Sequence, residues 1–230
     1  MKKIFTTFLA VFAVSLLCHG QGFINLNFES ANVVVLPPGQ SEFVTPAIAF
    51  PGWQLFWGAL PATQVSHNSE AIGSVRTAIL DPNYSLTPSL EGNFSIMLQP
   101  GFDPRIQAQT YSGIAQTATV PLLSQSLRFK LGHELPPRGG NLEVMLGGQS
   151  LGLVRLETAS TYDIYGVDIH AFAGLNTELR FTAIYNGVAL NNVTLDGIQF
   201  SPVAIPEPGT WSLLALGGAL GWWATRRRRS

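Results

Sequence analysis

The sequence predicts an all-β fold, an antiparallel sandwich of two sheets of the jelly-roll kind, flanked by a signal helix and a C-terminal transmembrane helix. Apolar and polar residues alternate with a period of two in many short segments, and no long segment of the body has helical periodicity. The 23 glycines and 15 prolines are typical of the turns between short strands. Because amphipathic strands can bury their apolar faces only against another layer, we expect two stacked sheets.

Residues 1–20 are predicted to be a secretory signal peptide. Two lysines precede an apolar run from about Phe8 to Leu17, which is too short to span a bilayer. We expect export through the Sec translocon and cleavage by signal peptidase after Gly20. Cys18 leaves a lipoprotein signal open as an alternative, although Leu17 stands where such signals have a small residue.

Residues 21–203 are predicted to form one β-sandwich domain. The clearest half-buried strand contains Leu127, Phe129 and Leu131, which alternate with a basic residue at each intervening position. The same alternation predicts strands within residues 24–29, 53–57, 142–146, 151–153, 167–170, 179–183 and 193–200.

Two glycine positions and two longer segments complete this prediction. Gly147-Gly148 indicates a hairpin turn, and a change of phase at Gly197 predicts a β-bulge. Residues 71–80 fit either a short helix or a strand. Residues 81–93 have the composition of a loop.

The distribution of charge excludes some partners. Six of the 13 basic residues lie in the two ends of the chain, whereas 13 of the 14 acidic residues lie between them. An acidic body argues against nucleic-acid binding, which needs a basic surface. The single cysteine lies in the leader, so the body has no disulfide and no thiolate metal site.

The C-terminal end, residues 204–230, predicts a membrane anchor. Residues 211–224 are apolar and uncharged, and four arginines follow at once. A buried C-terminal helix is the alternative, but arginines at this point suit the cytoplasmic edge of a membrane. Upstream, two prolines hold the backbone extended. The two prolines belong to the tripeptide Pro206-Glu207-Pro208, and the four arginines are Arg226, Arg227, Arg228 and Arg229.

This tail resembles the PEP-CTERM sorting signal of Gram-negative bacteria, because a Pro-Glu-Pro motif, a short apolar helix and a terminal arginine cluster occur in that order. The resemblance implies recognition by an exosortase, a membrane-embedded enzyme that cuts near Pro-Glu-Pro. It also implies a transient anchor in the inner membrane, followed by delivery to the cell surface or the extracellular matrix.

The body resembles galactose-binding-like jelly rolls, a group that includes many carbohydrate-binding modules. The segments that carry the resemblance are INLNFES, PGWQLFW, EGNFSIMLQP, IAQTATVP and VTLDGIQFSP. In such jelly rolls, an acidic residue of the first strand and an Asp of the last often share a structural calcium. The matching residues are Glu29 and Asp196, for which solvated or capping carboxylates are the alternative. No cofactor is otherwise required.

Aromatic rings are the candidate glycan contacts, because sugar rings stack on them. Tyr84 lies in a loop and is expected to be exposed, whereas Trp53 and Trp57 share one strand face and fit either a glycan site or the core. No arrangement of Ser, Cys, His or paired carboxylates predicts catalysis, so we assign no catalytic residue.

These observations leave three functions open. The first is a non-catalytic surface or matrix protein, exported and then sorted by its tail. The second is a carbohydrate-binding module with a specific glycan, such as an exopolysaccharide of the envelope. The third is a jelly-roll glycosidase or lyase.

Overall fold

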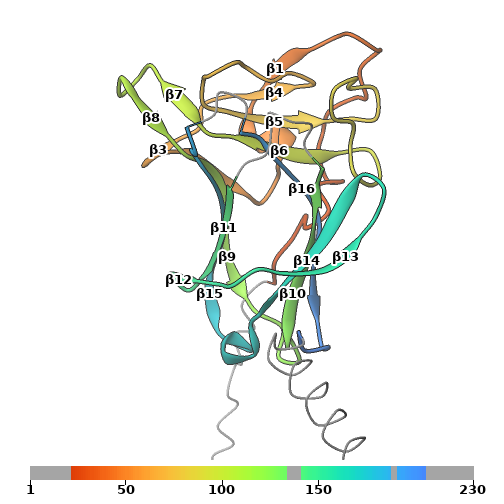
Figure 1. Ribbon diagram of the computed structural model, residues 1–230, viewed down its shortest axis with the longest axis vertical. Coiled ribbons are helices and arrows are strands. Elements are labelled where there is room, and N and C mark those ends of the chain that lie inside the picture. The colour runs from red at the N-terminus through yellow and green to blue at the C-terminus, as the bar shows by residue number, and fades with distance from the viewer. Residues whose placement is uncertain (1–21, 134–140, 188–190, 206–230) are drawn as a thin grey trace, which may run out of the picture.

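A computed structural model of the chain describes residues 22–133, 141–187 and 191–205. Two β-sheets pack against each other, and a small hairpin and two short helices join them (Figure 1). The all-β prediction is confirmed. The predicted signal peptide, the Pro-Glu-Pro segment, the apolar C-terminal segment and the arginine cluster lie outside the described residues. No helix within the described ranges has both the length and the apolarity needed to cross a membrane.

The larger sheet has eight strands. In spatial order they are β1 (Glu42–Val44), β4 (Val65–His67), β5 (Arg76–Leu80), β6 (Ser95–Gln99), β16 (Val193–Ser201), β10 (Ser126–Gly132), β14 (Tyr162–Asp168) and β13 (Val154–Thr158). Neighbouring strands are antiparallel except for β4 and β5, which are parallel.

The smaller sheet has six strands, all antiparallel. In spatial order they are β12 (Gln149–Ser150), β11 (Asn141–Leu146), β15 (Asn176–Ile184), β9 (Ser112–Thr119), β2 (Gln54–Trp57) and β3 (Leu60–Pro61). The separate hairpin consists of β7 (Gly101–Asp103) and β8 (Ala108–Thr110), and the helical turns are α1 (Pro46–Ala49) and η1 (His170–Phe172).

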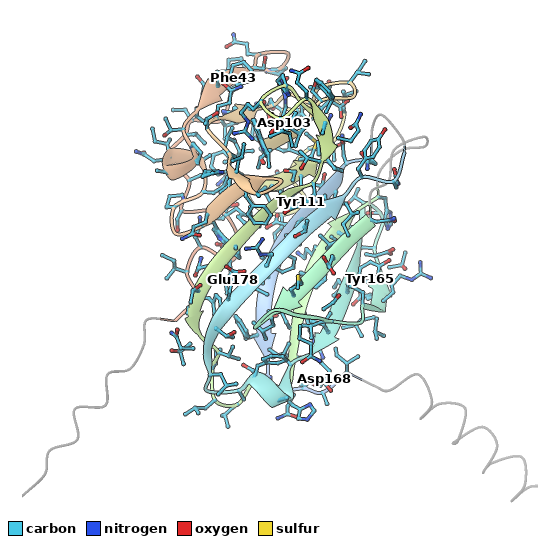
Figure 2. All side chains as sticks on the ribbon, turned by 90° about the vertical axis from the view of Figure 1, so that its left-hand side faces the viewer. Phe43, Asp103, Tyr111, Tyr165, Asp168 and Glu178 are labelled. Carbon is cyan, nitrogen blue, oxygen red and sulfur yellow. The ribbon has the colours of Figure 1, made fainter. Side chains whose placement is uncertain are left out.

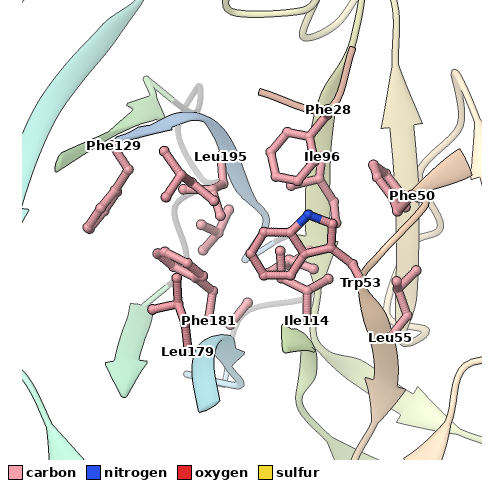
Figure 3. Close-up of a cluster of buried hydrophobic side chains, with 14 of the residues drawn as sticks. Phe28, Phe50, Trp53, Leu55, Ile96, Ile114, Phe129, Leu179, Phe181 and Leu195 are labelled. Atoms are coloured by element: carbon pink, nitrogen blue, oxygen red, sulfur yellow. The ribbon is translucent and has the colours of Figure 1, made fainter. Parts of the chain in front are cut away.

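The main core lies between the two sheets (Figure 3). The Phe181 ring on β15 makes an edge-to-face contact with Phe129 on β10, at a centroid distance of 5.3 Å, and with Trp53 at 6.5 Å. Each such aromatic pair adds about 0.5–1.5 kcal/mol beyond the burial of its area. The period-two pattern correctly placed Phe129 and Phe181 on the buried faces of their strands.

A second, smaller apolar cluster consists of Ala78, Leu80 and Met97 on β5 and β6. Tyr84, which was expected to be exposed, is half-buried instead, because its ring packs against this cluster. Residues 81–93 contain no strand or helix, as their composition predicted. Residues 71–80, for which helix and strand were both open, contain the strand β5.

Both predicted glycine features are confirmed. Gly147 and Gly148 have φ values of +59° and +78° and connect β11 to β12 by a two-residue turn. In the β10–β16 ladder, Arg128 pairs with Gln199 and Lys130 pairs with Asp196, so β16 carries one extra residue at the bulge. Gly197, with a φ of +55°, supplies the left-handed conformation that the bulge needs.

The predicted strand within residues 151–153 is wrong, because these residues lie between β12 and β13 and belong to neither strand. The predicted strand within residues 24–29 is also wrong, because this segment forms turns. Asn25 and Phe28 have φ values of +51° and +58°. The Asn25 side chain accepts a hydrogen bond from the Ser30 amide at 3.0 Å, which is a local alternative to a strand ladder. Phe28 is fully buried and packs edge-to-face on Phe50.

Candidate binding site

Strand β2 places two consecutive aromatic rings on opposite faces of the smaller sheet, and an arginine covers each ring. Trp57 belongs to the main core, and the Arg105 guanidinium carbon lies 4.9 Å from its ring centroid. Phe56 points the other way, and the Arg180 guanidinium carbon lies 4.4 Å from its ring centroid. Each arginine lines a hollow in the surface. We call the one lined by Phe56 and Arg180 the Phe56 hollow, and the one lined by Trp57 and Arg105 the Trp57 hollow.

The Phe56 hollow has a volume of about 670 Å³, within the usual range for small-molecule sites. Its lining includes Trp53, Gln54, Phe56, Tyr111 and Arg180. Tyr111 is 37% exposed and meets Phe56 edge-to-face at a centroid distance of 6.0 Å. Figure 2 shows Tyr111 above Glu178 on this side of the molecule.

The polar groups of the Phe56 hollow come from neighbouring strands. Arg180 on β15 donates from Nε to the Glu178 carboxylate at 2.8 Å, and both side chains are partly exposed. Gln54 on β2 is exposed. An apolar floor with a few hydrogen-bonding groups at its rim suits a ligand that has flat apolar faces and many hydroxyls.

The Trp57 hollow is smaller, at about 310 Å³, and most of its lining residues are polar or charged. Arg105 on its wall donates from Nη2 to the Asp103 carboxylate at 2.7 Å and from Nη1 to the Pro61 carbonyl at 2.8 Å. The Arg105 guanidinium holds the pKa of the buried Asp103 below its ordinary value, against the opposing effect of burial. Arg76 lines the same hollow.

The three aromatic residues proposed from the sequence do not form one site. The indoles of Trp53 and Trp57 are 6% and 8% exposed and belong to the core, and their ring nitrogens donate to the Asn25 carbonyl and to Thr77 Oγ1. Each indole also lines one of the two hollows, whereas Tyr84 lines neither. A glycan contact by these residues stays a prediction.

Tyr111 was one of several aromatic residues that the sequence offered for stacking, but it was not singled out, and sequence reasoning missed Phe56 and Arg180. The alternation in β2 indicates on which face of the sheet Phe56 lies. Arg180 lies near Phe56 only because the strands follow the order β2, β9, β15 within the sheet. In that register Gln54 and Arg180 both pair with Ala115. No local sequence signal reports such a pairing.

Glu29 and Asp196, the predicted calcium ligands, hold the same loop. Glu29 Oε1 accepts the backbone amides of Asn93 and Phe94 at 2.8 and 2.9 Å. Asp196 Oδ2 accepts the Ser95 hydroxyl at 2.7 Å and the backbone amide of Glu91 at 3.1 Å. The two carboxylates thus fix residues 91–95 from both ends.

Within the described ranges, no group of three or more His, Cys, Asp or Glu residues is arranged to hold a metal ion. Glu29 and Asp196 fit a calcium ion only in their oxygen chemistry, because calcium takes six or more oxygen ligands. Burial raises the pKa of Asp196 to about 7, although hydrogen bonds from Ser95, Gly197 and Glu91 oppose this effect. Calcium binding at this loop stays a prediction.

The buried His67 contacts two carboxylates that hold neighbouring strands together. His67 Nε2 lies 3.0 Å from the Asp81 carboxylate, and its Nδ1 lies 3.3 Å from Glu42. Burial alone would raise the pKa of Asp81, but hydrogen bonds from Leu36 and other neighbours, together with His67, lower it. Since both ring nitrogens of His67 have partners, this cluster ties together β1, β4 and the end of β5.

The tail matches a known family model. Residues 204–229 match the PEP-CTERM protein-sorting motif, and this range includes the Pro-Glu-Pro tripeptide and the arginine cluster. The resemblance proposed for the tail is confirmed. The motif indicates an exported protein that is sorted by an exosortase in a Gram-negative bacterium.

Some solved structures resemble the body weakly, at low identity and with TM-scores below 0.5. A Stig cyclase, Fisc, from Fischerella sp. TAU is 14% identical, with a TM-score of 0.45 over 78% of this chain and 94% of the cyclase. A family 11 carbohydrate-binding module from Clostridium thermocellum is 9% identical, with a TM-score of 0.37 over 73% of this chain and 98% of the module. A search of the curated proteins finds no match.

Proposed function

We propose that the protein is a non-catalytic component of the cell surface or extracellular matrix, delivered by exosortase sorting. The observation that carries this proposal is the match of residues 204–229 to the PEP-CTERM motif. In this proposal, signal peptidase removes residues 1–20 after translocation by Sec. The apolar segment 211–224 then holds the chain in the inner membrane until the exosortase cuts near Pro206-Glu207-Pro208.

A specific observation favours a second function, glycan binding by the β-sandwich. The Phe56 hollow combines the exposed Tyr111 ring with the polar side chains of Gln54 and Arg180. Sugars offer apolar ring faces for stacking and hydroxyls for hydrogen bonds, so both parts of the lining have a use. We propose that this hollow holds a glycan of the surface layer to which the protein is delivered.

Binding of the purified protein to a panel of soluble neutral and acidic polysaccharides, measured by isothermal titration calorimetry, tests this second function. Loss of one aromatic contact weakens binding by about tenfold, which is the effect we expect for Tyr111→Ala. Phe102→Ala is the matched control, because Phe102 is 36% exposed and lines neither hollow. Thermal unfolding checks that both variants are folded.

The possible outcomes separate the three functions. If no glycan of the panel binds, the glycan proposal fails and the surface-protein proposal stands alone. If Tyr111→Ala and Phe102→Ala weaken binding equally, the ligand lies outside the Phe56 hollow. Cleavage of a glycan that is abolished by replacing a single carboxylate would establish a glycosidase or lyase and refute the non-catalytic proposal.

A further inference from the structure

Arg76 in the Trp57 hollow is a half-buried cation whose known partners are all neutral. Its Nη1 donates to the hydroxyls of Ser66 and Ser69 at 2.9 and 3.4 Å, and its guanidinium carbon lies 5.4 Å from the Phe43 ring centroid. Burial lowers the pKa of Arg76, the Coulombic interaction with the Tyr84 phenol opposes this effect, and no carboxylate of the described ranges contributes. The free-energy cost of desolvating this charge is therefore not offset by an internal counter-ion among the described residues.

Most other cations of the body differ from Arg76 in this respect. Arg105, Lys130, Arg155 and Arg180 each form an ion pair with an Asp or Glu. Arg128 also lacks such a pair among the described residues, but it lines neither hollow. Arg76 is therefore the cation that presents uncompensated charge to a hollow of ligand size.

The acid that shares the hollow is already neutralised. Asp103 is fully buried, and Arg105 binds both of its carboxylate oxygens through Nε at 3.0 and 3.1 Å and one of them through Nη2. The backbone amide of Arg105 donates to the same carboxylate. Asp103 therefore does not repel an anion, and the hollow carries a net positive charge within an acidic body.

The remaining lining fits a hydroxylated ring. Thr63 and Gln64 are exposed at the rim, Ser74 adds a further hydroxyl, and Trp57 forms an apolar wall. A carboxylate accepts two parallel hydrogen bonds from a guanidinium, and sugar hydroxyls pair with hydroxyl and amide side chains. One free positive charge matches one carboxylate better than a doubly charged phosphate.

We propose that the Trp57 hollow is an anion subsite that binds the carboxylate of a uronic acid residue through Arg76. This inference rests on the proposed glycan binding and extends it, since it names acidic polysaccharide as the ligand class. A chain of such a polymer can contact the sandwich on both sides of β2, where the Phe56 and Trp57 hollows lie.

The test uses trigalacturonate and its methyl ester, in which a small methyl group removes the charge of each carboxyl group. Calorimetry on the full chain in detergent is expected to show tighter binding of the acid by about tenfold, the low end for a hydrogen bond to a charged group. Arg76→Gln should remove this preference. Arg76→Lys should retain part of it, because lysine keeps the charge but lacks the planar guanidinium that donates two parallel hydrogen bonds. Arg155→Gln, which alters the ion pair of an exposed arginine outside both hollows, should change nothing.

Several results would overturn the inference. Equal binding of the acid and the ester would do so, as would an unchanged preference in a folded Arg76→Gln variant. Displacement of trigalacturonate by an equal concentration of inorganic phosphate or acetate would show a general anion site rather than a uronate site. If neutral glycans still bind in a Tyr111-dependent manner, only this inference fails and the proposed glycan binding stands.

Discussion

The phenyl ring of Phe56 lies on Gly113, the residue that pairs with it across β2 and β9. A Cβ atom at position 113 would overlap this ring and would lie 2.7 Å from the Phe181 carbonyl oxygen. Arg180 covers the ring from another strand. The glycine therefore allows an aromatic side chain to lie flat against the sheet and to form the floor of the candidate glycan site.

Replacement of Gly113 by alanine should destabilise the protein by about 1–3 kcal/mol, the usual cost of overpacking a tightly packed position. Chemical denaturation measures the change in the free energy of unfolding. The matched control is Gly152→Ala, because a Cβ atom at position 152 meets no atom within 4 Å. Equal stability of the two variants would show that Phe56 does not lie against Gly113.

Stability should also depend on pH through Asp196. Its pKa is about 7 in the folded protein, compared with about 3.9 in an unfolded chain. A carboxyl group whose pKa rises on folding binds its proton more tightly when folded. Its contribution to stability therefore falls as the pH rises from about 4 to about 7, and stays level above pH 7. The full change is on the order of 4 kcal/mol.

Asp196→Asn should flatten this pH dependence, because the amide does not titrate. Urea denaturation at pH 5 and pH 8 measures the slope for the native protein and the variant. Asp168→Asn is the control, since the Asp168 side chain is 60% exposed and its pKa lies below the ordinary value. If the native protein and Asp196→Asn lose the same free energy between these pH values, the assignment to Asp196 is wrong.

Calcium binding by Glu29 and Asp196 makes a different prediction. Calcium needs ionised carboxylates, so its effect should be larger at pH 8 than at pH 5. At a concentration 100-fold above the dissociation constant, a bound ion adds about 2.7 kcal/mol, or about 5–10 °C in melting temperature for a chain of this size. Glu29→Gln should abolish this shift, and magnesium should not reproduce it. An unchanged melting temperature in calcium and in a chelator would reject the site.

Much of the fold could be predicted from the sequence because its signals are local. Alternation at Leu127, Phe129 and Leu131 required no knowledge of partner strands, and the phase change at Gly197 located the bulge. At residues 24–29 the alternation is outweighed by other local effects. Phe28 reaches the core from a left-handed conformation, and the Asn25 side chain competes with strand pairing.

The candidate site was less predictable because it depends on pairings between distant segments. Trp53 and Trp57 were correctly placed on one strand face, but only the packing of the sheets shows that this face is buried. Tyr111 and Arg180 become neighbours of Phe56 through the strand order of the smaller sheet. A single sequence carries no signal for that order.

The central claim is that the body is released from a disposable tail, and the intact mass of the protein recovered from the cell exterior tests it most directly. The full chain has a mass of 24.8 kDa. We expect a smaller species that begins at about Gln21 and ends near Ile205, together with any group attached at the cut. An exterior protein that still carries Arg226–Arg229 would contradict the claim and would leave the chain as a simple membrane-anchored protein.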